Sequence, residues 1–138
     1  MKNLRPLWNN LKKRLAPHLR VGAEGERFAA GHLRGLGYRI LERNVRFKRR
    51  GEIDIVAEEG GDLVFVEVKT RRVKGEYSAL WNITPAKRRK LIQLARLYCA
   101  ERGASERAMR FDVIGVEGWG GGRPEVTLIK FAFREERR

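Results

Sequence analysis

Two apolar segments joined by a pair of glycines constrain the fold of this chain more than any other feature. Residues 51–57 and 63–71 are rich in β-branched side chains, which favour strands. Between them, Gly60 and Gly61 can take the positive backbone angles that a tight hairpin turn requires. The sequence therefore predicts an antiparallel hairpin whose turn is centred between these two glycines.

A turn at this position sets the pairing register of the two strands. It places Asp54 opposite Glu67, and Glu52 opposite Lys69. Because side chains alternate across a strand, one predicted face carries Glu52, Asp54, Val56, Phe65, Glu67 and Lys69, and the other carries Ile53, Ile55, Val64, Val66 and Val68. The hairpin is therefore expected to have one uniformly apolar face and one face that carries the polar groups.

Two carboxylates that face each other across a hairpin repel, and such pairs destabilise a sheet. A divalent cation such as Mg²⁺ or Mn²⁺ offsets this repulsion, because hard cations bind carboxylate oxygens together with water and phosphate. With Asp54 and Glu67 as metal ligands, Lys69 could activate water or neutralise charge on a phosphate group. The alternative is a solvated sheet face on which Glu52 and Lys69 form an ion pair and the other carboxylates are merely exposed.

The charge of the chain indicates the class of partner. Its 138 residues include 31 lysines and arginines against 17 acidic residues, which gives a formal net charge of +14. An excess of this size favours binding to a polyanion, with nucleic acid as the leading candidate. A ribosome-associated factor or a protein that binds membrane surfaces would share this charge. Acidic residues clustered within a basic chain favour metal-assisted chemistry on phosphate instead.

Length and composition bound the organisation of the chain. A single domain is expected over residues 21–138, preceded by a basic arm over residues 1–20. The single cysteine, Cys99, excludes an intrachain disulfide and a cysteine metal cluster. No apolar run is long enough to span a membrane, and the first residues lack the apolar core of a signal peptide. These features predict a cytoplasmic protein with no membrane partner.

The first predicted helix carries a carboxylate on its apolar side. Apolar residues of segment 23–36 recur at helical spacing, and Gly37 is a suitable end for the helix. Glu26 lies on the stripe that faces the sheet. Two explanations remain open. Glu26 reaches Asp54 and Glu67 as a third ligand of metal or water, or it stabilises the helix N-terminus through the macrodipole.

The rest of the chain predicts three further strands and a second helix. The strands cover residues 38–47, 109–116 and 125–133. The helix begins at Thr84 and Pro85, a capping residue followed by a proline at the first helical position, and ends at Gly103. Asp112, in the first of the closing strands, is expected to be structural. The order α-β-β-β-α-β-β indicates an α/β domain.

Several basic residues near the predicted site are candidates for nucleic-acid contacts. They lie in the turn before the hairpin, at the end of its second strand and in the first turns of the second helix: Arg49, Arg50, Arg71, Arg72, Lys87 and Lys90. An ordinary solvated surface would carry such charges as well. In the loop after the hairpin, Tyr77 and Trp81 either stack on bases or cover the sheet edge.

Short motifs between Val21 and Val116 occur together in a recognisable combination. They are Gly25-Glu26, Arg43-Asn44, Gly51-Glu52-Ile53-Asp54, Val66-Glu67-Val68-Lys69 and Arg110-Phe111-Asp112. The combination resembles the YraN family of small bacterial proteins, within the PD-(D/E)xK, or restriction-endonuclease-like, nuclease superfamily; the superfamily's proline before the aspartate is isoleucine here. The resemblance implies a mixed central sheet flanked by helices, as in archaeal Holliday-junction resolvases, with Glu26, Asp54, Glu67 and Lys69 as the site residues.

These observations lead to two hypotheses. The first is a divalent-metal-dependent endonuclease that hydrolyses phosphodiester bonds of DNA, which is favoured over RNA, with branched or structured DNA as the expected substrate. Asp54 and Glu67 would hold Mg²⁺ or Mn²⁺, Lys69 would activate water and Glu26 would assist. Symmetrical cleavage of a junction would require a homodimer. The alternative is an accessory protein that keeps the nuclease fold and binds nucleic acid without cutting it.

Overall fold

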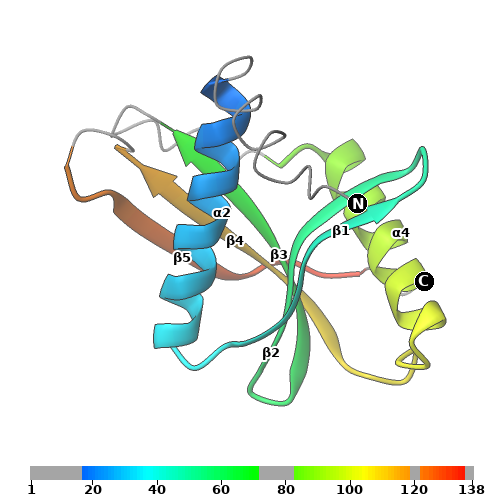
Figure 1. Cartoon of the computed structure of the whole chain (residues 1–138). Helices are drawn as coiled ribbons and strands as arrows, with labels where there is room; N and C mark the ends of the chain where they lie inside the picture. Colours follow the sequence, from blue (N-terminus) through cyan, green and yellow to red (C-terminus); the bar gives the residue numbers. More distant parts are fainter. Residues whose placement is uncertain (1–16, 72–82, 119–121, 136–138) are drawn as a thin grey trace, which may run out of the picture.

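The computed structural model describes residues 17–71, 83–118 and 122–135. Within these ranges, two helices and five strands follow one another in the predicted order (Figure 1): α2 (Pro17–Gly35), β1 (Arg39–Phe47), β2 (Gly51–Glu59), β3 (Asp62–Arg71), α4 (Pro85–Glu101), β4 (Met109–Glu117) and β5 (Glu125–Phe133). The predicted α/β fold is confirmed. The expected arm up to residue 16, and the loop with Arg72, Tyr77 and Trp81, lie outside the described residues.

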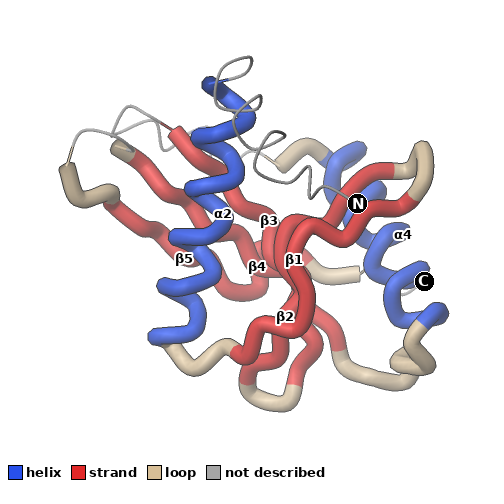
Figure 2. The backbone as a smooth tube through the Cα atoms, in the orientation of Figure 1, coloured by secondary structure: helices blue, strands red, loops and turns tan. Residues whose placement is uncertain are grey.

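The five strands form one mixed sheet. Their order is β1-β2-β3-β4-β5, with β3 and β4 parallel and the other neighbours antiparallel. Parallel neighbours need a long crossover connection, and α4 lies in the connection between β3 and β4. The helices α2 and α4 lie on opposite faces of the sheet (Figure 2). The architecture is therefore a single sheet between two helices, as the motif combination implied.

Each face of the sheet packs against one helix. The core beneath α4 includes Val56 and Phe65, and the core beneath α2 includes Val64 and Val66. The prediction of one uniformly apolar hairpin face and one polar face is therefore wrong for the inner part of the hairpin. A central strand covered by helices on both sides must be apolar on both sides. Only the outer ends of these strands carry the polar groups.

The predicted turn and register are confirmed for the inner hairpin. Gly60 and Gly61 have φ angles of 59° and 85°, which is the left-handed region that glycine tolerates best. Pairing between β2 and β3 extends from the turn as far as Ile55 opposite Val66, in the predicted register. The glycine pair therefore determines which residues of the two strands face each other.

Beyond Ile55 the sheet divides. β2 remains paired with β1 to its first residue, whereas β3 continues beside β4, and the two branches diverge (Figure 1). Glu52 consequently lies opposite Arg46, with which it forms an ion pair of 3.5 Å, and not opposite Lys69 as predicted. Ile53 packs into the core beneath α4. A two-stranded ribbon twists more strongly than a wide sheet, which accounts for this departure from simple alternation.

α2 begins earlier than predicted. It starts at Pro17, not at Ala23, so it includes the last residues of the expected arm. It ends at Gly35, and Leu36, which was expected to belong to the helix, is 52% exposed. Gly37, with φ of 93°, reverses the chain toward β1, as a glycine after a helix commonly does.

α4 begins as predicted. The Oγ1 of Thr84 accepts a hydrogen bond of 3.1 Å from the Lys87 amide, and Pro85 takes the first turn of the helix. Cys99 is buried on the apolar side of this helix. Within the part of the chain that the structure describes, neither helix is both long enough and apolar enough to cross a membrane.

A buried arginine joins the β2–β3 turn to β4. Arg110 is only 4% exposed, and it donates hydrogen bonds of 3.1 Å to Asp112 and to Asp62 and a further one to Glu59. The Tyr38 hydroxyl donates to the other oxygen of Asp112 at 2.7 Å. Asp112 is therefore a structural acid, as expected from its place in a strand, because its charge is neutralised inside the protein.

Replacement of Arg110 by methionine should destabilise the protein by roughly 3–5 kcal/mol, since it would leave the Asp112 carboxylate buried without its cation. Urea denaturation would measure the loss. Arg107→Met, which removes an exposed ion pair with Glu58, serves as the matched control and should have a much smaller effect. Equal losses in the two variants would contradict the assignment of Arg110 as a core residue.

Candidate functional site

The candidate site lies at the point where β2 and β3 separate. Asp54 stands one residue beyond the last β2–β3 pair, and its Oδ2 accepts a hydrogen bond of 2.9 Å from the Val68 amide. A side-chain oxygen thereby satisfies an amide that a continuous ladder would have paired with a backbone carbonyl. This bond holds the Asp54 carboxyl group in the fork between the two branches of the sheet.

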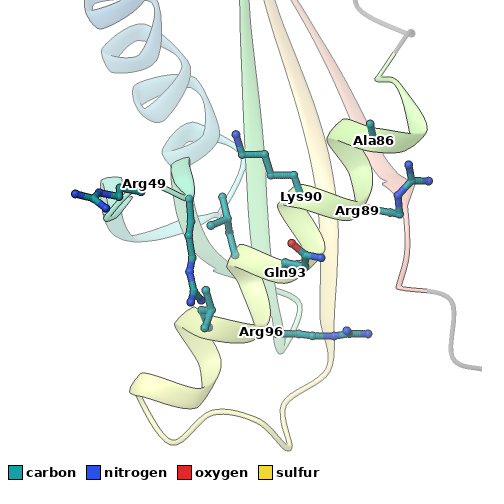
Figure 3. A pocket seen from close by; sticks show the side chains of 9 residues that line it. Arg49, Ala86, Arg89, Lys90, Gln93 and Arg96 are labelled. Carbon is teal, nitrogen blue, oxygen red and sulfur yellow. The ribbon is translucent and has the colours of Figure 1, made fainter.

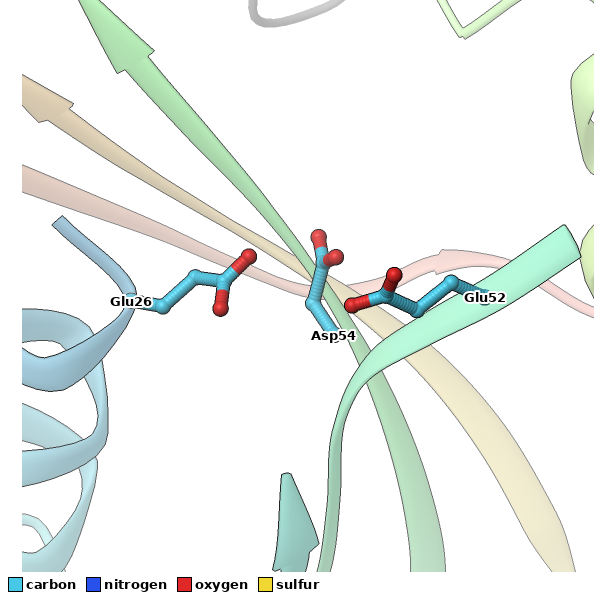
Figure 4. Close-up of side chains that lie close together, drawn as sticks. All are labelled: Glu26, Glu52 and Asp54. Atoms are coloured by element: carbon cyan, nitrogen blue, oxygen red, sulfur yellow. The ribbon is translucent and has the colours of Figure 1, made fainter. Parts of the chain in front are cut away.

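Two further carboxylates converge on Asp54. Glu26 comes from α2 and Glu52 from β2, and the three side chains each offer an oxygen atom within 4.8 Å of the others (Figure 4). We call these three residues the acidic group. The structure thus brings Glu26 close to Asp54, one of the two acids that it was predicted to reach. Glu52 was predicted only as an ion-pair partner, although its spacing of two residues from Asp54 already put both carboxylates on one strand face.

The surroundings of Asp54 and Glu26 raise the pKa of both carboxyl groups. Burial, followed by the charge of Glu67, raises the pKa of Asp54 well above its ordinary range. Burial and the charge of Glu52 likewise raise the pKa of Glu26. Because each ionised carboxylate is disfavoured by its neighbours, a bound cation would relieve the repulsion among them.

Asn44 is a site residue that was not predicted beyond its place in a motif. In β1 it lies across from Asp54 of the neighbouring strand β2. It has a positive φ of 53°, which asparagine tolerates better than most residues. Both side-chain neighbours of its amide are carboxylates, so the amide nitrogen must face them. It then donates to Glu52 at 2.9 Å and to Glu26 at 2.5 Å. Asn44 therefore bridges two members of the acidic group.

Glu67 and the lysines lie beside the acidic group. Glu67 is 8% exposed, and its Oε1 lies 3.8 Å from the Lys69 Nζ and 3.3 Å from the Lys87 Nζ. The predicted pair of metal ligands, Asp54 and Glu67, is thus arranged differently from the expectation. Among the described residues, Asp54 groups with two other acids, while Glu67 contacts two cations and acts on Asp54 through its charge.

The predicted nucleic-acid contacts occupy several different places. Arg49, Arg50 and Lys90 line a concavity between the β1–β2 turn and α4 (Figure 3). Lys87, on the same helix, contacts Glu67 in the site itself. Arg71 lies at the end of β3, and Arg72 falls outside the described residues. The predicted contacts that the structure describes therefore come mainly from one helix and one turn, whereas Arg46 of β1, which was not predicted, pairs with Glu52 of the acidic group.

A glycine lets α2 bring Glu26 to the site. A Cβ atom placed on Gly25 would lie 2.3 Å from the Thr70 Oγ1 and 2.9 Å from its Cγ2, both closer than real contacts allow. Only a residue without a side chain permits this approach of α2 to β3. In the motif Gly25-Glu26, the glycine thus allows α2 to pack closely against β3, and this packing brings the Glu26 carboxylate to the site.

Gly25→Ala should cost roughly 1–3 kcal/mol of stability, because the methyl group would force α2 away from β3. Gly31→Ala on the same helix is the matched control, since a Cβ there meets nothing within 4 Å. The control should gain about 0.5–1 kcal/mol through helix propensity. Chemical denaturation would compare the two variants, and a gain in both would contradict the tight contact.

Asp54→Asn should stabilise the protein in EDTA, because it removes a disfavoured charge and keeps an oxygen that can accept from Val68. A raised pKa means that the folded protein retains a proton that the unfolded chain releases, so the stability of the parent falls as pH rises above the ordinary range of aspartate. The free energy of unfolding of the variant should therefore exceed that of the parent by a growing amount between about pH 5 and pH 8, as measured by urea denaturation.

The exposed Glu101 on α4 provides the control for this pH trend. Its carboxylate is 62% exposed, so Glu101→Gln should change stability little at any pH in this interval. If Asp54→Asn were less stable than the parent at the upper pH, mutual repulsion within the acidic group would not describe the site.

Comparison with known proteins identifies the family of this chain. Residues 25–116, which contain the whole acidic group, match the sequence model described as "Uncharacterised protein family UPF0102". The UPF0102 protein of Symbiobacterium thermophilum is 51% identical over 114 residues, 83% of this chain and 96% of the relative. That of Rhodococcus jostii is 40% identical over 119 residues, 86% of this chain and 100% of the relative. The chain belongs to the UPF0102 family, the YraN family that its motifs predicted.

Proposed function

We propose that this protein is a divalent-metal-dependent endonuclease that hydrolyses phosphodiester bonds of DNA. The observation that carries the proposal is the convergence of Glu26, Glu52 and Asp54 at the fork of the sheet, within one cation's reach. A lysine from the adjacent strand, Lys69, and the buried Glu67 lie beside this group. The net charge of +14 makes a phosphate polymer the natural partner of such a site.

The donor atoms of the acidic group suit Mg²⁺ or Mn²⁺. They are all carboxylate oxygens, which are the ligands that hard divalent cations prefer. All three side chains are partly exposed, so water and phosphate could share the cation with them. Asp54, Glu26 and Glu52 would bind the cation. We keep Glu67 as a proposed ligand because it is close enough for its charge to act on Asp54. A bound cation supplies Lewis acidity that activates water and neutralises charge on phosphate.

The remaining residues of the site have roles that follow from their contacts. Lys69 is 23% exposed in its side chain, so its ammonium group can meet a substrate phosphate and stabilise the charge that develops there. Glu67 holds this ammonium group in position from 3.8 Å. Asn44 keeps Glu26 and Glu52 together by donating to both. These contacts fix the reacting groups before substrate binds, which is the main protein contribution to phosphate chemistry.

Branched or structured DNA is the substrate class that we propose. Support comes from the resemblance of the motifs to those of Holliday-junction resolvases, in which a glutamate of the first helix joins an aspartate and a Glu-x-Lys. Glu26, Asp54, Glu67 and Lys69 match that set residue by residue. Symmetrical cuts in a junction need two sites, so this substrate also implies a homodimer.

One observation favours a second candidate function. Glu67 forms ion pairs with both Lys69 and Lys87, and these contacts already neutralise its carboxylate without a metal ion. A protein that retained the nuclease fold only to bind nucleic acid could use Glu67 in this structural way. It would bind DNA with a steep salt dependence and would not cut it.

The two candidates differ in a cleavage assay. Labelled linear, single-stranded, flap and four-way-junction DNA would be incubated with the protein in Mg²⁺ or Mn²⁺. We expect cutting by the parent, and a loss of at least ~10²-fold in Asp54→Ala and in Lys69→Met, because each removes a group that stabilises the transition state. DNA binding should persist in both variants.

Glu58→Gln is the matched control, since Glu58 lies at the other end of β2 and pairs with Arg39 and Arg107. It should cut like the parent. Thermal unfolding with and without Mn²⁺ would show separately whether Asp54 binds the cation. Cutting by Asp54→Ala would overturn the proposed site, whereas binding by all variants with no cutting by any would favour the accessory protein.

A further inference from the structure

The surface beside the acidic group forms a basic concavity of about 730 Å³ between the β1–β2 turn and α4. Five of the described residues that line it are cations and none is a carboxylate (Figure 3): Arg49, Arg50, Arg89, Lys90 and Arg96. We call this surface the basic concavity. Leu94 and Leu97 supply apolar surface between the charges. The composition suits a ligand that carries several negative charges.

Most of these cations lack internal partners. In the part of the chain that the structure describes, Arg49, Arg50, Arg89 and Lys90 take part in no ion pair, whereas Arg96 pairs with Glu135. Cations that repel one another at close range raise the local positive potential, and a polyanion would lower it. Within the described ranges, four of the five cations of the basic concavity therefore have no carboxylate partner.

The basic concavity is a preformed feature of the fold. Gly51, at the end of the β1–β2 turn, has a φ of 133°, and a Cβ on it would lie 2.8 Å from the Lys90 Cε and 3.3 Å from a methyl group of Leu94. The turn and α4 are thus in direct contact at this point. Because Leu94 is also part of the buried core, the position of the cations is tied to the packing of the sheet.

The basic concavity is close to the candidate site along both the helix and the turn. Lys87 contacts Glu67, and Lys90 follows it on the same helix face at a spacing of three residues. In the turn, Arg50 precedes Glu52 by two residues. From Lys87 to Leu97 the helix rises about 15 Å. This length corresponds to roughly four phosphates along one strand of a duplex.

We propose that the basic concavity holds the phosphodiester backbone of the nucleic acid on the α4 side of the scissile phosphate. The position of the scissile phosphate rests on the proposed function, whereas binding of the backbone does not. Cations from Lys87 to Arg96, spread along about 14 Å of helix, suit an extended chain of phosphates better than a single phosphate group. The substrate must therefore extend past the acidic group by about four nucleotides in the direction of α4.

The binding part of the proposal is tested without catalysis. Fluorescence anisotropy in EDTA would measure the Kd for a labelled duplex of about 20 base pairs at several salt concentrations. In Arg50→Gln/Lys90→Gln, the slope of log K against log salt should fall by about two, because each lost phosphate contact contributes about 0.9. The affinity at low salt should fall about tenfold or more.

Arg34→Gln/Arg39→Gln removes the same charge from the last turn of α2 and the first residue of β1, where both side chains are exposed. It should leave the slope unchanged. Equal changes in the two double variants would overturn the proposal, because they would report total charge alone. A stronger effect of Arg50→Gln/Lys90→Gln on anionic phosphatidylserine vesicles than on DNA would also overturn it and would assign the surface to membranes.

The length requirement on the α4 side is tested on cleavage. In duplexes whose cut position is moved progressively toward one end, the rate of the parent should fall about tenfold when fewer than about four base pairs remain on the α4 side, and this fall should be much smaller in Arg50→Gln/Lys90→Gln. An equal fall in the parent and the double variant would overturn the placement of the backbone at the basic concavity. A protein that shows the salt-slope difference but cuts no DNA would overturn the proposed function and leave the backbone site standing.

Discussion

The hydrogen bond from the Val68 amide to the Asp54 carboxylate is the interaction on which the functional architecture depends. It occurs where β2 stops pairing with β3, and it satisfies an amide that would otherwise lose its partner. The same bond fixes the carboxylate in the fork. From there β1 and β2 turn toward α4, while β3 continues beside β4 (Figure 1). Both the acidic group and the basic concavity lie along this division.

Opposite charges that are intermixed in the sequence are separated in space. Glu52 belongs to the acidic group, while Arg50, two residues earlier in the chain, lines the basic concavity. α4 shows the same sorting, because Lys87 contacts Glu67 and Lys90 belongs to the concavity. Under the proposed function, a polymer of repeated phosphates would match this pattern: one phosphate would approach the carboxylates while its neighbours would be held by arginine and lysine.

Much of the fold could be predicted because it rests on local signals. The two glycines at 60–61 set the hairpin register, and Thr84 with Pro85 sets the start of α4; both expectations agree with the structure. The errors have a different origin. The apolar Val56 and Phe65 were assigned to a polar face, since alternation alone cannot show that a second helix covers that face. The start of α2 at Pro17 was missed because the basic segment before it has weak helical periodicity.

By itself, the sequence determined the strand and helix order, the hairpin register and the candidate acids Glu26, Asp54 and Glu67, because spacing and residue type carry that information. Only the tertiary structure decided which of the acidic side chains lie close together. Glu52 and Asn44 join the site because β2 leaves β3 and twists with β1, and Glu67 turns to Lys87 because α4 crosses its face of the sheet. These contacts depend on how segments that are far apart in the sequence pack against one another, and residue spacing along one strand does not contain that information.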